Sequence, residues 1–290
     1  MYCDDIFLLS ASRAGLQSLM TTCEKFASQN NLTFSTNIDP KKSKTKCMIF
    51  NKSPAKRVGV PEIILNNKPL PWVPQLNHLG HIFECENNLS NDTSSKKFKF
   101  IGKVNTIKQG FHFANPNVKV TLYDKYAASF YGSNLWNLFC HETEKVYSAY
   151  NISIRQAFNL PFATHRYLIQ YLIDHPHIKI QFCSRFIKFV SNNDACKKPI
   201  IRLISALNKS DNRTVYCSNI WNISKECSVD QDMITSSIVK SNMQYFKIPS
   251  GEEWRPDLLL NIIFTKLGLF SVENFDFEEL DDILEFLCTS

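Results

Sequence analysis

Two adjacent carboxylates stand near the start of the chain. Residues 2–5 read Tyr-Cys-Asp-Asp and precede an apolar run, Ile-Phe-Leu-Leu, at 6–9. Neighbouring carboxylates repel each other unless a cation lies between them, and their hard oxygen atoms suit Mg²⁺. Two-metal polymerases use such carboxylates to activate a hydroxyl group and to stabilise the leaving pyrophosphate. Asp4 and Asp5 are therefore candidate catalytic residues and magnesium ligands, although such a pair also occurs in turns and helix caps.

Lysine residues gather in two later segments. The first spans residues 41–57 and includes Lys42 and Lys44. The second alternates with phenylalanine, and its lysines are Lys96, Lys97, Lys99, Lys103 and Lys108. Lysines with interleaved aromatic residues are typical of surfaces that follow nucleic-acid phosphates. The second segment predicts a helix with lysines on one face and apolar residues opposite. A solvated loop and an ordinary amphipathic helix are the alternatives for the two segments.

The N-terminal segment that carries the carboxylates predicts a strand and a helix. The apolar run at 6–9 has β-branched and aromatic character, which predicts a buried strand. A helix capped by Ser10 or Ser12 follows and ends near Asn30. Its predicted apolar face consists of Leu16, Leu19, Met20, Cys23, Phe26 and Ala27, which recur at three- and four-residue spacing.

Turn signals and periodicity divide the rest of the chain. Asn66 and Asn67 predict a hairpin turn, and residues 76–83 predict an extended segment that bends at Gly80. Residues 93–191 have helical periodicity. Their predicted apolar stripes are Phe98, Ile101, Val104, Ile107 and Phe111, then Val118, Leu122, Tyr126, Ser129 and Phe130. Residues 192–230 are polar and only weakly periodic.

These patterns predict an α+β chain. Residues 1–90 form short antiparallel strands with a helix, residues 91–190 are helical, and residues 191–290 are a helical C-terminal region with an acidic tail.

Four segments occur in an order and spacing that known proteins share. They are residues 2–5, residues 12–27 (Ser-Arg-Ala-Gly-Leu-Gln to Cys-Glu-Lys-Phe-Ala), residues 37–50 with Lys-Lys-Ser-Lys, and residues 77–83, Asn-His-Leu-Gly-His-Ile-Phe. In this order they resemble motif C, the helix that follows it, motif D and motif E of reverse transcriptases from non-LTR (LINE-like, jockey-like) retrotransposons. The resemblance is close over residues 1–85, looser over 93–190 and absent beyond about 190.

The resemblance implies a fold and a reaction. The first 90 residues would be a partial polymerase palm with motifs C, D and E, and residues 91–190 a thumb-like region. The family adds deoxynucleotides from dNTP to a DNA primer on an RNA template, with two magnesium ions. The implied partners are therefore RNA, a DNA primer and dNTP.

The same resemblance implies roles for particular residues. Asp4 and Asp5 match the metal-binding carboxylates, with Asp4 the more direct ligand, and Tyr2 matches the aromatic residue beside the primer end. Lys42, with Lys44 as the second choice, matches the lysine that assists the leaving pyrophosphate. Leu79 and Gly80 match the primer-grip hairpin, and the five lysines between residues 96 and 108 would bind phosphates along the thumb.

One departure from the family affects the expected activity. Motif A, with a third metal-binding carboxylate, and motif B precede motif C in the family, and neither is found in these 290 residues. We therefore expect a truncated polymerase that is catalytically incomplete. The alternative is a non-enzymatic nucleic-acid-binding remnant that uses the thumb-like helices. A third interpretation is a helical interaction module.

Charge and composition restrict the possible partners. Residues 271–290 hold seven acids and no Lys or Arg, so residues 1–270 carry a net charge of +13, which suits a polyanionic partner. The acidic tail, with its apolar residues, is expected to dock on Lys96 to Lys108 or to remain solvated. No apolar run is long enough for a membrane span, and the ten cysteines include no Cys-x-x-Cys pair. We expect an intracellular protein, in the nucleus or cytoplasm, with free thiols.

Overall fold

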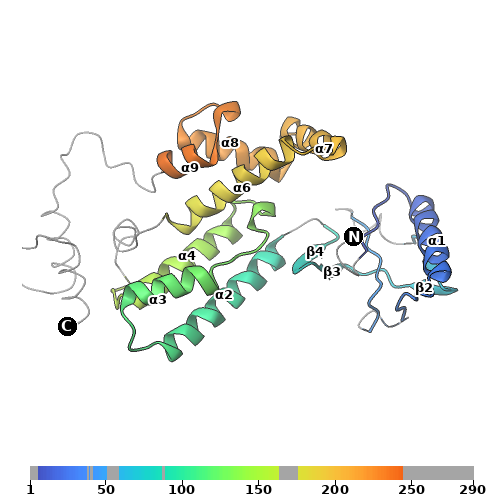
Figure 1. Cartoon of the computed structure of the whole chain (residues 1–290), viewed down its shortest axis with the longest axis horizontal. Helices are drawn as coiled ribbons and strands as arrows, with labels where there is room; N and C mark the ends of the chain where they lie inside the picture. The colour runs from blue at the N-terminus through green and yellow to red at the C-terminus, as the bar shows by residue number, and fades with distance from the viewer. Residues whose placement is uncertain are drawn as a thin grey trace, which may run out of the picture. The chain divides into compact units, whose positions relative to one another are not determined.

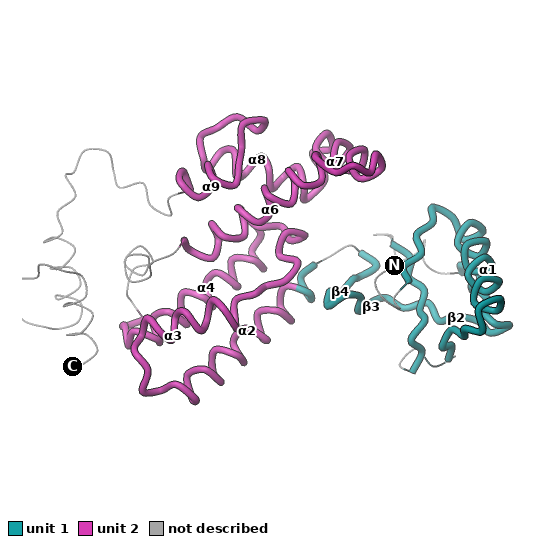
Figure 2. The backbone as a smooth tube through the Cα atoms, viewed as in Figure 1, with its two compact units in different colours: residues 1–92 teal, residues 93–290 magenta. Residues whose placement is uncertain are grey.

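The computed structural model of the chain describes residues 6–37, 39, 42–50, 59–86, 89–162 and 176–243. Within these residues the chain forms eight α-helices and two small antiparallel hairpins, so it contains both helix and sheet as expected (Figure 1). It divides into two compact units, Met1–Asp92 and Thr93–Ser290 (Figure 2).

The first helix of unit 1, α1 (Arg13–Gln29), begins where the sequence predicts. The side chain of Ser12 accepts a hydrogen bond from the backbone N–H of Gly15, which satisfies one of the unpaired donors of the first turn. Met20 and Ala27 are buried, whereas Leu19 and Phe26 are exposed. The predicted helix and its cap are therefore confirmed, but part of its predicted apolar face points to solvent.

A hairpin of β1 (Ile63–Leu65) and β2 (Lys68–Leu70) lies beside α1. Asn66 and Asn67, its turn residues, have φ values of 51° and 57°, as a type I′ turn requires, which confirms the predicted turn. The Gln17 side chain donates to the carbonyl of Ile64 and accepts from its N–H. A helix side chain therefore pairs the backbone groups of β1 that no strand pairs.

The core of unit 1 lies between α1 and this hairpin. Its buried members are Met20, Cys47, Ile63, Leu65 and Leu70, and Leu8, Leu16, Phe34 and Trp72 pack against them. Cys47 forms a single parallel bridge with Trp72.

The predicted buried strand at residues 6–9 is wrong. The segment has no strand partner among the described residues, and Ile6, Phe7 and Leu9 are exposed. Leu8 packs on the core of unit 1, while Phe7 contacts the second hairpin. A strand needs a neighbour to pair its backbone groups, so an apolar run alone does not form one.

The second hairpin of unit 1 consists of β3 (Gln75–His78) and β4 (His81–Glu84). The segment 76–83 was predicted to be extended with a bend at Gly80, and the bend is a full reversal. Leu79 and Gly80 form its two-residue turn, with φ values of 48° and 77°. Both residues adopt the left-handed region. Gly80 does so without a steric penalty, whereas the side chain of Leu79 makes this conformation unfavourable.

Unit 2 is helical throughout its described residues. Its elements are the rest of α2 (Ser90–Gly110), then α3 (Pro116–Leu122), the π-helix η2 (Tyr123–Ala127), the 3-10 helix η3 (Ser133–Leu135), α4 (His141–Ala157), α6 (Ile178–Asp194), α7 (Pro199–Ser210), α8 (Val215–Cys227), the 3-10 helix η4 (Gln231–Met233) and α9 (Ser236–Asn242). α6 is central, because it packs against η3, α4, α7 and α9 (Figure 1). Residues 192–230 contain α7 and α8 despite their weak periodicity, as expected for a helical C-terminal region.

Aromatic rings form the centre of unit 2. Trp136, Tyr147, Tyr150 and Phe182 are fully buried, and the Trp136 and Phe182 ring centroids lie 5.7 Å apart in an edge-to-face arrangement. Asn219 of α8 donates to the carbonyl of Trp136 and accepts from the N–H of Leu138. These two hydrogen bonds satisfy backbone groups of Trp136 and Leu138 that would otherwise be buried without a partner.

Candidate nucleic-acid interface

Three of the predicted site residues lie outside the described part of the chain. They are Tyr2, Asp4 and Asp5. The described segment begins at Ile6, and the next residue, Phe7, is the first with a ring contact.

Phe7 contacts the second hairpin. Its ring stacks on His78 with 5.2 Å between the ring centroids and 25° between the ring planes, and its centroid lies 6.4 Å from that of Phe83. His78 and Phe83 share a face of the hairpin, because side chains alternate along each strand. We call Phe7, His78, Leu79, Gly80 and Phe83 the hairpin surface. This surface brings Phe7, which follows Asp5 by two positions, next to the hairpin whose turn, Leu79 and Gly80, resembles the primer grip.

A buried polar contact anchors this hairpin. The Asp92 side chain, in the first turn of α2, accepts a hydrogen bond from the N–H of Ile82 at 3.0 Å, and its other oxygen lies 3.2 Å from Nδ1 of His81. Neither His81 nor Asp92 was singled out for this role. The only sequence signal is an acid in a predicted first helical turn, where the helix dipole favours it.

The loop predicted to be motif D holds its lysines in solvent. Ser43 is buried and donates to the carbonyl of Thr45, while its N–H donates to the carbonyl of Asp39. Lys42 and Lys44 lie on either side of Ser43 and are exposed. The loop therefore has a fixed centre with two free cationic side chains, as either a phosphate contact or a solvated loop would have.

The lysines of α2 do not form a single face. The buried stripe of this helix consists of Phe100, Val104 and Ile107, so Val104 and Ile107 of the predicted apolar face are confirmed, whereas Phe98 is 66% exposed. The lysines lie on both sides of this stripe. Lys97 and Lys108 lie toward α4, and Lys96, Lys99 and Lys103 lie toward η2 and η3.

Aromatic side chains accompany the second group of lysines. The ammonium of Lys96 lies 6.0 Å from the ring centroid of Tyr131 and 5.7 Å from that of Trp136. Lys103 donates to the carbonyl of Tyr126 at 3.0 Å. Tyr126 and Tyr131 are each about two-thirds exposed, although the periodicity placed Tyr126 on a buried stripe. We call Lys96, Lys99, Lys103, Tyr126 and Tyr131 the α2 surface.

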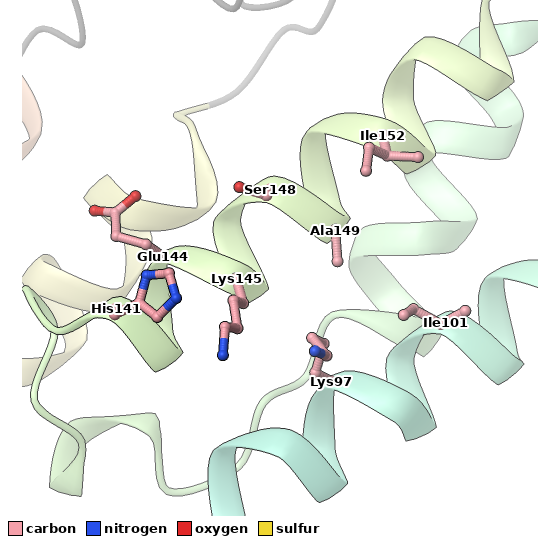
Figure 3. A pocket seen from close by; sticks show the side chains of 8 residues that line it. All are labelled: Lys97, Ile101, His141, Glu144, Lys145, Ser148, Ala149 and Ile152. Carbon is pink, nitrogen blue, oxygen red and sulfur yellow. The ribbon is translucent and has the colours of Figure 1, made fainter. Parts of the chain in front are cut away.

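On the other side of α2, an open hollow lies between α2 and α4 (Figure 3). Lys97 and Lys145 point into it, Ile101, Ala149 and Ile152 supply apolar walls, and His141 and Glu144 lie at one end. Lys145 donates to Glu142 at 2.7 Å. This hydrogen bond, with the charges of Lys145, His141 and Lys97, lowers the pKa of Glu142 below its ordinary value.

The described residues do not add magnesium ligands to Asp4 and Asp5. No group of three His, Cys, Asp or Glu side chains among them lies in an arrangement that would hold a metal ion. Two buried histidines have protein partners instead, since His81 pairs with Asp92 and His177 with Asn151. The magnesium expectation therefore depends on Asp4 and Asp5 alone.

Comparison of the whole chain with models of protein families, with curated proteins and with solved structures finds no match. None of the helices in the described ranges is both long enough and apolar enough to cross a bilayer.

Proposed function

We propose that this chain is part of the RNA-directed DNA polymerase of a non-LTR retrotransposon and that it binds the end of a DNA primer on an RNA template. One observation carries the proposal. Phe7, two residues after the Asp4-Asp5 pair, stacks on His78 of the hairpin whose turn is Leu79 and Gly80. Two segments with separate resemblances to the primer-binding parts of a polymerase are therefore in contact.

The contact agrees with what primer binding demands. The 3′ hydroxyl of a primer has to reach the catalytic carboxylates, while the backbone just behind it is held in place. A hairpin that contacts the segment next to the carboxylates is suited to that second task. Phe7 is exposed and His78 and Phe83 are half-buried, so their rings offer stacking partners for a terminal base.

The α2 surface would contribute non-specific affinity. Lys99 is exposed, and Lys96 lies beside the exposed ring of Tyr131. Lys103 donates to the backbone carbonyl of Tyr126, whose ring is exposed. Cationic groups bind phosphates, and aromatic rings accept stacked bases of any sequence. Binding of this kind weakens steeply with salt, since each neutralised phosphate releases counterions.

A position-specific cross-link tests the proposal. A DNA primer with 5-iododeoxyuridine as its terminal 3′ nucleotide is annealed to an RNA template and irradiated with the full 290-residue chain. Adducts are mapped by mass spectrometry. We expect them at Phe7, His78 or Phe83, with a strong reduction for His78→Ala.

Two controls make this result decisive. The same reactive base at the 5′ end of the primer should not label the hairpin surface, and His112→Ala, which changes an exposed histidine of unit 2, should leave the adducts unchanged. Adducts confined to unit 2 for both primers would reject the proposed primer site.

A second candidate function is nucleic-acid binding without catalysis, and the α2 surface favours it because it belongs to unit 2 alone. Primer extension with Mg²⁺ separates the two candidates. A polypeptide of these 290 residues offers two motif C carboxylates without the third that the family uses, so we expect no incorporation of labelled nucleotide. Incorporation that Asp4→Ala abolishes would instead establish the polymerase activity in these residues.

A further inference from the structure

α7 carries an apolar stripe that no described residue covers. Ile200, Leu203, Ile204 and Leu207 are 59%, 55%, 50% and 59% exposed and recur at the spacing of one helix face. The helix packs on α6 and α8 through a different face, where Ser205 is buried and donates to Asp194 and contacts the hydroxyl of Tyr216. Figure 1 shows α7 at the end of α6. A continuous exposed stripe of this kind is typical of a docking surface.

The charged side chains of α7 itself and of the two residues before it are all positive. Residues 195–210 contain no acid, and Lys197, Lys198 and Arg202 are exposed. Lys197 and Lys198 also precede the first turn of α7, where the helix dipole adds positive potential. The surface therefore suits a partner that is both apolar and acidic. It disfavours a second copy of α7, whose positive charges would face its own.

The chain's own last segment has these properties. Residues 271–290 lie outside the described part of the chain, but their sequence holds seven acids and no base. Leu280, Ile283, Leu284 and Leu287 repeat the spacing of Ile200, Leu203, Ile204 and Leu207. The tail was expected to dock on Lys96 to Lys108 or to remain solvated, but those lysines lie on two sides of α2 and not along one face.

The connecting chain is long enough for the tail to reach α7. Residues 244–270 separate the last described residue, Met243, from the tail, and this length spans up to about 90 Å when extended. Met243 follows α9, which packs on α6, and α7 packs on the same helix. Because α6 has 17 residues, it is only about 25 Å long.

We propose that residues 271–290 bind α7 within the same chain, with the apolar residues 280–287 on the Ile200–Leu207 stripe and the tail acids beside Lys197, Lys198 and Arg202. The covalent link gives the tail an effective concentration of about 1 mM near its own α7, so a weak intrinsic affinity is sufficient. The proposal is independent of primer binding.

Hydrogen exchange and zero-length cross-linking test the proposed binding of the tail to α7 on the full chain at about 1 μM. At this concentration the tethered tail, at an effective concentration of about 1 mM, greatly exceeds any tail from another molecule. In the double variant Leu284→Ser/Leu287→Ser, we expect the amides of α7 to exchange roughly tenfold faster than in the unchanged chain. A carbodiimide should join Lys197 or Lys198 to Asp281, Asp282 or Glu285 in the monomer, and Leu203→Ser should abolish these links. Met233→Ser, which removes an exposed apolar side chain elsewhere in unit 2, is the matched control and should change neither result.

Three outcomes would overturn the proposal. The first is unchanged exchange of α7 in the tail variant together with an absence of links to Lys197 and Lys198. The second is cross-linking of the tail acids to Lys96 to Lys108 instead. The third is protection of α7 that rises with protein concentration, with links found only in dimers, which would assign the stripe to a second copy.

Discussion

Nδ1 of His81 lies 3.2 Å from Oδ2 of Asp92, and both residues are buried. The other oxygen of Asp92 accepts from the backbone N–H of Ile82. One carboxylate therefore ties strand β4 to the first turn of α2. His81 lies on the same face of the hairpin as His78 and Phe83, so this link holds the hairpin surface beside its contact with Phe7.

Replacing Asp92 with alanine should weaken this anchor. The change leaves the buried His81 ring and the partly buried N–H of Ile82 without this acceptor, so we expect unit 1 to lose about 2–4 kcal/mol of stability. Urea titration followed by hydrogen exchange of β3 and β4 measures the loss. Asp232→Ala, at an exposed aspartate in η4, is the control and should change stability by less than about 0.5 kcal/mol. An equal effect of both changes would contradict the assigned role of Asp92.

Replacing Leu79 with glycine should stabilise the same hairpin. Leu79 has a φ of 48°, which costs an L-residue with a side chain more than it costs glycine, and its side chain is 40% exposed, so little burial is lost. We expect a gain of about 1 kcal/mol in the unfolding free energy of unit 1. Asn77→Gly, in the neighbouring strand position, should instead destabilise it. A loss of stability in Leu79→Gly would mean that the side chain packs more than its exposure indicates.

The α2 surface should reveal itself through salt dependence. Lys99→Ala should weaken binding of single-stranded RNA similarly for all sequences and should reduce the slope of log affinity against log salt by about 0.7. Fluorescence anisotropy at several salt concentrations measures both quantities. Lys240→Ala, an exposed lysine on α9, should leave the slope unchanged. Identical slopes for Lys99→Ala and the unchanged chain would remove Lys99 from the interface.

Alkaline pH should destabilise unit 1 through Cys47. Burial raises the pKa of its thiol from 9.0 to about 11. The unfolded chain therefore releases this proton at lower pH than the folded chain, so stability is full below about pH 9 and falls as the pH rises toward 11. Unfolding free energies at pH 8, 9 and 10 in reducing buffer should fall less steeply for Cys47→Ala. Cys196→Ala, at a half-buried thiol in unit 2, should retain the original slope of unit 1.

Features that depend on neighbours in the sequence were predictable. The cap of α1 by Ser12 is a hydrogen bond across three residues, and the Asn66-Asn67 turn needs only two residues that tolerate positive φ. The resemblance of residues 77–83 to a primer-grip hairpin was likewise present in the sequence, although their reversal at Leu79 and Gly80 was seen only as a bend. No structural finding tests the assignment of Asp4, Asp5 and Tyr2, which lie outside the described residues.

The sequence by itself determined where several helices and turns begin and end, because local hydrogen bonds and allowed φ values set those limits. Only the tertiary structure decided which stripe of each helix is buried. Val120, Tyr123 and Ala127 are buried, whereas Val118 and Tyr126 of the predicted stripe are exposed. Likewise, the run at 6–9 did not become a strand and the stripe of α7 stayed exposed. Burial depends on which distant surface is present to pack against, and that information is not local.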